Sequence, residues 1–152
     1  EQESAEEEAL WNISLKSDDT IQINKYKGTE AEVVILDELK YNGRYYKVEK
    51  VGRMAFKSNL SLRKLTITEN IKEIDEEAFR GCTNLTSVNY AGTSKLQTIG
   101  ASAFYGDAAL KTIDIPAKVE TIGKNAFRGC TGLESVDLTK AVQQRGIDVT
   151  TL

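Results

Sequence analysis

The sequence contains no histidine, and this absence narrows its chemistry more than any other feature of the composition. Ser-His-Asp and Cys-His mechanisms need an imidazole base, and many zinc sites need an imidazole ligand, so these are excluded. The chain also lacks any apolar run near the ~20 residues that a membrane-spanning helix needs. Its 152 residues are 40% hydrophobic and 28% charged, which is typical of a single globular domain with a full core.

The sequence also has no strong charge bias, since it contains 23 acidic and 20 basic residues and its net charge is −3. Five of the acids lie among the first eight residues, so the rest of the chain holds 18 acids and 20 bases. Nucleic-acid binding needs a concentrated basic face, and none is expected here. Residues 1–9 are predicted to form an acidic flexible tether. Because the chain begins at Glu1 without methionine, we expect a mature or trimmed form whose export signal or anchor lies outside this sequence.

What the chain has in abundance is a repeat. An Ala-Phe pair occurs four times, and the intervals between its phenylalanines are 23, 25 and 23 residues. Apolar residues recur at fixed distances on both sides of each pair, for example a leucine six residues after each phenylalanine. Self-similarity at this period predicts a solenoid, in which each coil buries its apolar edge against its neighbours. We number the coils 1 to 4 and expect one buried stack of their phenylalanines: Phe56, Phe79, Phe104 and Phe127.

Each coil contains two short strand patterns. A run of the form L-x-x-V-x-I alternates with period two, and strands from successive coils should pair in parallel about 4.8 Å apart. A V-x-x-I-G run predicts a shorter strand on the opposite side, and the residues around Ala-Phe should form one helical or 3₁₀ turn. Two small-residue columns should mark turns. The first should be a sharp turn with positive φ, at Gly52, Asp75, Gly100 and Gly123. The second marks the turn after each phenylalanine, at Ser58, Gly81, Gly106 and Gly129.

The repeats occupy residues 48–138, and the flanking segments differ from them. Residues 10–47 have strand-like composition and predict an N-terminal β cap, with Trp11 and several tyrosines sealing the open end and Val33-Val34-Ile35 forming a buried run. Residues 139–152 lack the pattern and predict a C-terminal cap or a truncated repeat. The two extra residues of the long interval fall between 89 and 95, where a solenoid accommodates insertions in a loop.

These repeats resemble the BspA-type leucine-rich repeat family. The resemblance rests on VEKVGRMAFKSNLSLRKLTI, IKEIDEEAFRGCTNLTSVNY, LQTIGASAFYGDAALKTIDIP and VETIGKNAFRGCTGLESVDL. The family usually places proline after the strand, and here only Pro116 does so. The resemblance implies a right-handed leucine-rich repeat solenoid of the α/β horseshoe type, made mostly of short parallel strands with 3₁₀ or irregular turns. It also implies a secreted or cell-surface bacterial protein, often in host-associated species, that acts in adhesion or protein recognition, and it brings no catalytic residues.

The two cysteines, Cys82 and Cys130, occupy the same slot of coils 2 and 4, three residues after phenylalanine. Cysteines at this position could form a disulfide, bind a metal together or act as nucleophiles. Two stacked coils separate the thiols by ~10 Å, which exceeds the roughly 7 Å Cα limit for a disulfide. We therefore favour two inert thiols, each packed beneath a loop and hydrogen-bonded to its backbone.

Carboxylates supply the remaining enzymatic hint, because Asp114 and Asp137 occupy matching strand positions in adjacent coils. Paired carboxylates can hydrolyse glycosidic bonds, but such a site needs a cleft with aromatic side chains that stack on the sugar. The neighbouring strand positions are instead Ser, Thr and Asn, so two solvated side chains on a sheet surface are the preferred interpretation. A weak calcium site is conceivable, yet no dense acidic loop is present. We expect no enzyme activity, no cofactor and no metal site.

Two surfaces remain as candidate binding sites. The residues directly after the four phenylalanines form a column, and three of the four are basic: Lys57, Arg80 and Arg128, with Tyr105 in coil 3. This basic edge could meet an anionic glycan or an acidic protein patch, although such a column is more often a solvated turn. The strand face consists of the residues that alternate with the buried ones of each long strand. Its members are Lys64, Thr66, Thr68, Ser87, Asn89, Thr112, Asp114, Ser135 and Asp137.

The sequence thus predicts a non-catalytic binding scaffold, extracellular or at the cell surface. A protein partner, such as a host matrix or surface protein, is the first expectation. A glycan-binding module and a structural spacer that presents another domain are the alternatives. We expect a monomer. The strand face lacks the Tyr, Trp or Arg anchors that dominate interface energetics, so weak binding that relies on avidity or on the 91–95 loop is expected.

Overall fold

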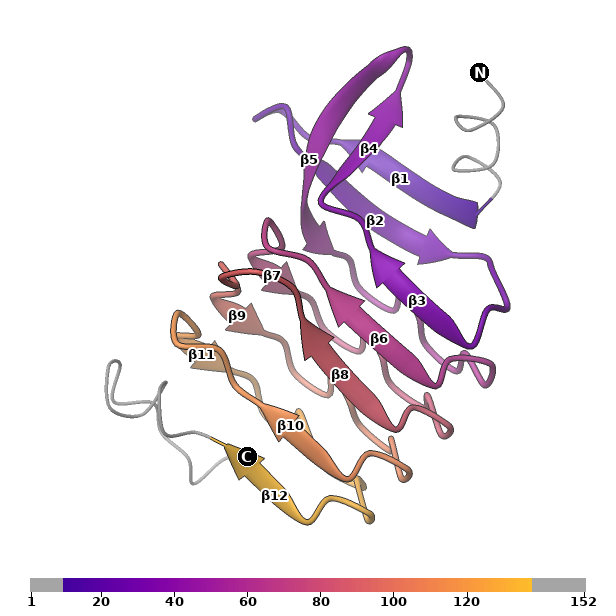
Figure 1. The fold of residues 1–152 in the computed structure, drawn as a ribbon, viewed down its shortest axis with the longest axis vertical. Helices are drawn as coiled ribbons and strands as arrows, with labels where there is room; N and C mark the ends of the chain where they lie inside the picture. The colour runs from indigo at the N-terminus through magenta and orange to yellow at the C-terminus, as the bar shows by residue number, and fades with distance from the viewer. Residues whose placement is uncertain (1–9, 138–152) are drawn as a thin grey trace.

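The computed structural model describes residues 10–137, which form short strands joined by turns (Figure 1). The strands are β1 (Trp11–Leu15), β2 (Ile21–Tyr26), β3 (Glu32–Ile35), β4 (Glu38–Tyr41), β5 (Arg44–Val51), β6 (Lys64–Ile67), β7 (Glu73–Ile74), β8 (Ser87–Tyr90), β9 (Thr98–Ile99), β10 (Thr112–Asp114), β11 (Thr121–Ile122) and β12 (Ser135–Asp137). The tether at 1–9 and the segment 139–152 lie outside the described residues.

The strands stack on two sides of the molecule, so the solenoid predicted from the repeats is confirmed. One side carries the long strand of each coil, with β3, β6 and β8 in one parallel sheet and β10 and β12 in another. The other side carries the short strands in the order β5-β7-β9-β11, all parallel. Both rows run along the long axis in Figure 1. The ladder of short strands therefore joins all four coils, and ladders of long strands join coil 1 to coil 2 and coil 3 to coil 4.

The core between these two rows is built on the phenylalanine column. Neighbouring rings are stacked, with centroid separations of 4.8, 5.3 and 5.5 Å and interplanar angles of 24°, 10° and 8° from coil 1 to coil 4. Tyr26 continues the stack toward the N-terminus, 5.0 Å from Phe56, and Trp11 packs on Tyr26 at 4.7 Å. Phe56, Phe79 and Phe104 have no exposed surface. Aromatic side chains of the N-terminal cap thus close the first coil.

The turn around each Ala-Phe pair is a series of hydrogen-bonded β-turns. In coil 1 the amides of Ala55, Lys57 and Asn59 each donate to the carbonyl three residues earlier. Left-handed residues interrupt the series, so no continuous helix forms. They stand two residues before and two residues after each phenylalanine: Met54, Ser58, Glu77, Gly81, Ser102, Gly106, Asn125 and Gly129.

The prediction of positive φ at Gly52, Asp75, Gly100 and Gly123 was therefore wrong, whereas the second small-residue column, predicted to mark the turn after phenylalanine, does lie in that turn and has positive φ. The left-handed residue lies two positions later than expected. The glycines of the first column have another physical reason. A Cβ at Gly100 would lie 2.6 Å from the Glu76 amide nitrogen of the preceding coil. At this position the coils approach so closely that a side chain would collide with backbone.

The cap strands differ from expectation at Val34. In the buried run predicted from Val33 to Ile35, both end residues are buried, but Val34 is 49% exposed. The reason is that β3 pairs in parallel with β6, with Val34 opposite Thr66, and so extends the strand face instead of closing the core. Side chains alternate along a strand, so the middle residue faces outward. The cap also contains an antiparallel hairpin, β4–β5, which projects beyond the coils in Figure 1.

The row of long strands is interrupted between coils 2 and 3. Within residues 10–137, β8 pairs only with β6 and β10 pairs only with β12, so the expectation of parallel pairing along the whole row was wrong at this junction. The interruption coincides with the 25-residue interval, whose extra residues form a loop after β8 that includes Gly92 at φ 67°. On the opposite side β7 and β9 remain paired. The insertion therefore separates the coils on the strand face only.

Candidate binding face

The strand face forms rows of side chains that cross the sheet. Register places Val34, Thr66 and Asn89 side by side, and pairs Asp114 with Asp137. A second row contains Glu32, Lys64 and Ser87, followed by Thr112 opposite Ser135. The residues chosen from the sequence thus lie on one side of the solenoid. Side chains at Lys64, Asn89, Thr112, Asp114 and Ser135 are exposed, whereas Thr66, Thr68 and Ser87 are half-buried.

Two members of the face already have partners within the protein. The Lys64 ammonium lies 3.5 Å from the Glu32 carboxylate, and the Thr68 hydroxyl donates to the carbonyl of Ile35. Both bonds tie coil 1 to the cap strand β3. The polar groups left for a partner are therefore concentrated in coils 2 to 4.

Sequence reasoning missed the apolar end of this face. Val34 in β3 and Leu36 directly after it are exposed by 49% and 38%. They are two of a handful of large hydrophobic side chains that the described residues expose. The signal was present, since β3 carries the same alternation as the repeat strands, but its membership of the strand face depends on the pairing with β6. The face therefore runs from an apolar end to a polar middle and then to Asp114.

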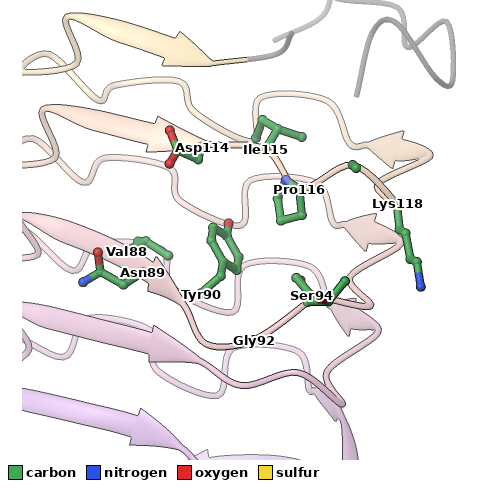
Figure 2. Close-up of a pocket in the computed structure, with 11 residues that line it drawn as sticks. Val88, Asn89, Tyr90, Gly92, Ser94, Asp114, Ile115, Pro116 and Lys118 are labelled. Atoms are coloured by element: carbon green, nitrogen blue, oxygen red, sulfur yellow. The ribbon is translucent and has the colours of Figure 1, made fainter. Parts of the chain in front are cut away.

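A pocket of about 550 Å³ opens where the row of strands is interrupted (Figure 2). Its floor comes from the end of β8, one wall comes from the loop after β8, and the other wall comes from β10 and the turn that follows it. The residues that define it best are Asn89, Tyr90, Ser94, Asp114, Pro116 and Lys118.

Tyr90 is the unusual residue of this pocket. It occupies a column that holds Ile67 and Ile115 in the neighbouring coils, and Figure 2 shows its ring extending from β8 toward the coil of β10. The hydroxyl oxygen is buried and has no hydrogen-bond partner among the described residues. Burial, and secondarily the charge of Asp114, raise the pKa of this hydroxyl. Tyr90 is therefore a neutral polar group placed where the repeat normally has a hydrocarbon.

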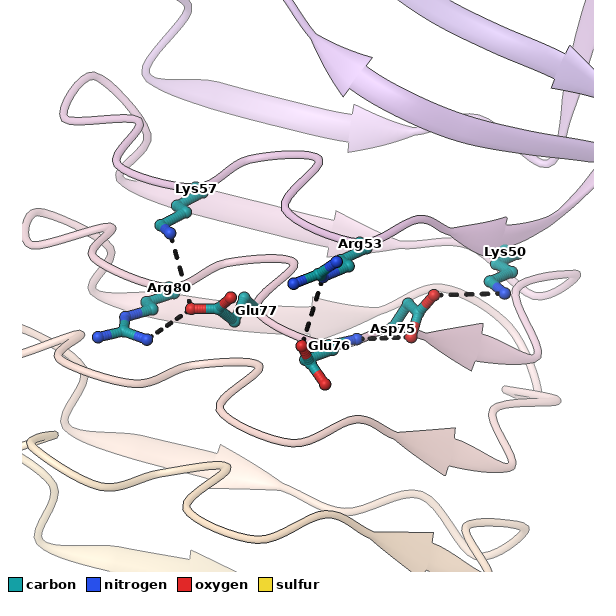
Figure 3. Close-up of polar contacts among 7 residues, drawn as sticks. All are labelled: Lys50, Arg53, Lys57, Asp75, Glu76, Glu77 and Arg80. Atoms are coloured by element: carbon teal, nitrogen blue, oxygen red, sulfur yellow. Dashed lines mark hydrogen bonds and ion pairs between the residues drawn. The ribbon is translucent and has the colours of Figure 1, made fainter.

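The basic edge is largely neutralised within the protein (Figure 3). In coils 1 and 2, Lys57 and Arg80 both form ion pairs with Glu77, and Lys57 lies 3.7 Å from it. The Arg80 guanidinium also lies 4.5 Å from the ring centroid of Tyr105. The hydrogen bond from Arg80, and the charges of Lys57 and Arg80, hold the pKa of the Glu77 carboxyl below its usual value. Arg128 is exposed and has no ion pair within residues 10–137.

The cysteines lie in the core as free, buried thiols. Each Sγ donates to a phenylalanine carbonyl of the preceding coil, Cys82 to Phe56 at 3.2 Å and Cys130 to Phe104 at 3.1 Å. Burial raises the pKa of Cys82 to about 12 and that of Cys130 to about 11, and the nearby Asp107 adds to both shifts. Thiols with such pKa values hold no thiolate at neutral pH, so these two act as coil-to-coil links rather than nucleophiles.

Asp107 fills the cysteine slot of coil 3 and is fully buried. Its Oδ1 accepts a hydrogen bond from the Cys82 amide at 2.9 Å, whereas Oδ2 has no partner among the described residues. Burial raises the pKa of this carboxyl to about 9, although backbone amides of Cys82 and Gly81 oppose the shift. The carboxyl is therefore neutral at pH 7. In coil 1 the same slot holds Asn59, whose amide group bonds Gly28, Ser61 and Leu62.

Within residues 10–137 no group of three or more acidic or cysteine side chains could hold a metal ion. In the same residues no helix has the length and apolar character needed to cross a membrane.

Short parallel strands on two sides, a central phenylalanine stack and hydrogen-bonded turns at a period of 23 to 25 residues define a leucine-rich repeat solenoid. The family model for the BspA type leucine rich repeat region matches residues 49–149, in six copies. The chain belongs to this family.

Solved structures agree on the fold. A leucine-rich repeat protein from Bacteroides capillosus ATCC 29799 is similar with a TM-score of 0.75 and 27% identity, over 84% of this chain and 93% of that one. The T. pallidum leucine rich repeat protein has a TM-score of 0.63 and 24% identity, over 88% and 77%. The pneumococcal vaccine antigen PcpA has a TM-score of 0.66 and 22% identity, and the similarity covers 82% of this chain but 30% of PcpA. A comparison with curated proteins finds no significant match.

Proposed function

We propose that this protein is a non-catalytic scaffold that binds another protein through its strand face. The observation that carries the proposal is the mixed character of that face. Exposed Val34 and Leu36 lie at one end, polar side chains such as Asn89 lie in the middle, and Asp114 lies near the other end. Protein interfaces combine an apolar part with a polar surround in this way. Extended faces of solenoids are a common site for protein partners.

The proposed setting is the cell surface or the extracellular space, with adhesion to a host matrix or surface protein as the proposed role. The support for this setting is the resemblance of the repeats to a family of secreted and surface proteins. We propose a monomeric module, because a strand face can bind a partner without a second copy of the chain.

The experiment is a binding screen of the whole chain against host matrix and surface proteins, followed by substitution of the face. Asn89→Arg combined with Thr66→Arg places two bulky charges in the middle row. The matched control is Lys16→Glu combined with Lys124→Glu, two exposed residues outside the strands of the face and outside the pocket. We expect the first pair to reduce affinity by about 100-fold and the control to leave it unchanged, since bulky charges at the centre of an interface cost several kcal/mol. Equal affinity of both variants would contradict the proposal.

A glycan-binding module remains the second candidate, and Arg128 is the observation that favours it. This residue is exposed and unpaired within residues 10–137, in contrast to the other two basic residues of the edge. The edge would then bind a sulfated or carboxylated sugar through a single free guanidinium. A glycan array decides between the candidates, because retention on acidic glycans that Arg128→Gln abolishes would favour the edge over the strand face. A spacer that only presents another domain would bind in neither assay.

A further inference from the structure

The pocket at the strand interruption contains polar groups that the fold does not use. Asp114 is exposed, and neither a hydrogen bond nor an ion pair engages it within residues 10–137. The Tyr90 hydroxyl is buried and equally without a partner there. Asn89 is exposed on the other side of the opening. A buried hydroxyl without a partner costs free energy, so its retention in place of the isoleucine of neighbouring coils requires a compensating gain.

The pocket is also formed by a local departure from the repeat. Coils 1 and 2 are joined by pairing of their long strands, but between coils 2 and 3, where two extra residues follow β8, this pairing is absent. An open space of about 550 Å³ lies there instead. Side chains and small ligands occupy pockets of about this size, roughly 300–1,000 Å³. The insertion and Tyr90, which stands where neighbouring coils have isoleucine, thus lie at the same place, and both line the pocket.

The charge of this opening favours a cation. Asp114 supplies a free carboxylate, and in the sheet Asp137 is its register partner in the next coil. The one cationic residue that lines the pocket is Lys118, and Figure 2 shows its side chain directed away from Tyr90 and Asp114. All three unused groups can accept a hydrogen bond through oxygen. A guanidinium carries up to five donors in one plane, and an ammonium carries three, so a basic side chain complements this set.

We propose that this pocket anchors a single arginine or lysine side chain of the protein that binds the strand face. The inference rests on the proposed function, because the pocket lies within that face, between β8 and β10, and would add the charged anchor that the strand residues lack. The carboxylate of Asp114 binds the cationic group, the Tyr90 and Asn89 oxygens accept its remaining hydrogen bonds, and Pro116 packs against the aliphatic stem.

A small probe tests the pocket without knowledge of the partner. N-acetyl-argininamide is titrated into the isotopically labelled whole chain, and amide chemical shifts are followed by NMR. The neutral isostere N-acetyl-citrullinamide is titrated in parallel. We expect the arginine probe to shift amides of the β8 end, of the 91–95 loop and of β10, and the citrulline probe to bind at least about tenfold more weakly, because a charged hydrogen bond is lost.

Three variants make the assignment specific. Asp114→Asn should weaken the arginine probe by about tenfold or more. Tyr90→Phe should weaken it by about fivefold while leaving the unfolding midpoint unchanged or higher, since it removes a hydroxyl that has no partner in the fold. A purely structural role of that hydroxyl would instead lower the midpoint. Glu32→Gln is the matched control, because this carboxylate lies on the same face but is paired with Lys64, and it should leave binding unchanged.

Other outcomes overturn the inference. Shifts that Asp114→Asn does not change would place the probe elsewhere, for example on the acid-rich residues 1–9. Equal affinity for both probes would exclude charge recognition, and tighter binding of a monosaccharide in the pocket would make it a sugar site. A partner that Asn89→Arg combined with Thr66→Arg releases, but that Asp114→Asn leaves bound at full affinity, would remove the anchor and keep the proposed function.

Discussion

The junction between coils 1 and 2 and the junction between coils 2 and 3 have the same core but different strand faces. At the first, β6 and β8 pair over four residues, and Phe56 and Phe79 stack at 4.8 Å. At the second, Phe79 and Phe104 stack at 5.3 Å and β7 pairs with β9, yet β8 and β10 are not paired. Both junctions keep the ladder of short strands and a row of backbone hydrogen bonds between the Ala-Phe turns, such as Phe56 N to Ala78 O and Phe79 N to Ala103 O. The second junction lacks only the ladder of long strands.

This difference shows that backbone pairing of the long strands is not required for stacking of the coils. The side chains of the core, the short strands and the hydrogen bonds between the Ala-Phe turns keep the third coil in line, so a two-residue insertion changes one surface without disturbing the rest. Each coil contacts only its neighbours in a solenoid, and a local irregularity is therefore tolerated. The first junction is the reference against which the variants below are judged.

Removing the core contribution should have the largest effect. Phe104→Ala takes a fully buried ring from the junction that lacks one ladder, and we expect the free energy of unfolding to fall by about 3–5 kcal/mol. Denaturant unfolding monitored by circular dichroism measures this loss. Phe104→Leu is the control and should cost less than half as much, because most of the volume remains. An unchanged midpoint for Phe104→Ala would show that the open junction does not depend on the ring.

The buried carboxyl of Asp107, three residues after Phe104, should give the next largest effect. Asp107→Asn supplies the amide that Asn59 uses in coil 1 and removes an ionisable group, so we expect a gain of about 1–3 kcal/mol at pH 7–8. The folded pKa of about 9 lies above the unfolded value near 3.9, so the folded state holds one extra proton between them. The stability that the protonated Asp107 carboxyl contributes is fully present below about pH 4 and is lost as the pH rises toward 9.

Unfolding midpoints measured from pH 4 to pH 9 test this statement. The parent protein should lose stability across the range relative to Asp107→Asn, and the difference between them should widen with pH. A constant difference would mean that Asp107 does not titrate in this window. Native thiols provide a parallel control, because Cys82 and Cys130 should stay unreactive toward a disulfide reagent in both proteins until they unfold.

Closing the open junction should give a smaller effect. Deletion of Gly92 and Thr93 restores a 23-residue interval, and we expect β8 and β10 to pair as β6 and β8 do. Amides in β10 should then exchange with deuterium about five- to tenfold more slowly, which corresponds to roughly 1 kcal/mol for a hydrogen bond. The same deletion should abolish binding of the arginine probe. Unchanged exchange would show that the interruption has a cause other than the extra residues.

The smallest effect is expected at the cap. Lys64→Gln removes the ion pair with Glu32, but both side chains are more than half exposed. Water and salt screen such pairs, so stability should change by less than about 0.5 kcal/mol. A larger loss in denaturant unfolding would mean that this pair, and not the β3–β6 ladder, joins the cap to the strand face.

Much of this architecture could be predicted from the sequence, because the solenoid depends on columns of apolar residues that the repeat displays directly. Leu62 and Ile67 recur at fixed offsets, and the buried position of such columns follows from period alone. The position of the insertion could be predicted too. The loss of pairing between β8 and β10 could not be predicted, because it depends on the path of the loop after β8.

Two other failures have local causes. Positive φ was assigned to Gly52 and its equivalents because glycine commonly marks left-handed backbone, whereas here it marks a close approach between coils, and Met54 adopts the left-handed conformation. Val34 was assigned to the core from an apolar run that cannot reveal which side of a strand faces water. The pocket around Tyr90 was missed because tyrosine at an aliphatic position looks like one more buried residue.

The open junction between β8 and β10 has a consequence for how the molecule bears mechanical load. When a solenoid is pulled along its long axis, every junction carries the same tension, since the coils are connected in series. The junction with the fewest backbone hydrogen bonds across it therefore separates first. Among the four coils that the structure describes, that junction lies between coils 2 and 3, so their extension under force should begin at the pocket, and a ligand that bridges its two walls should raise the force required.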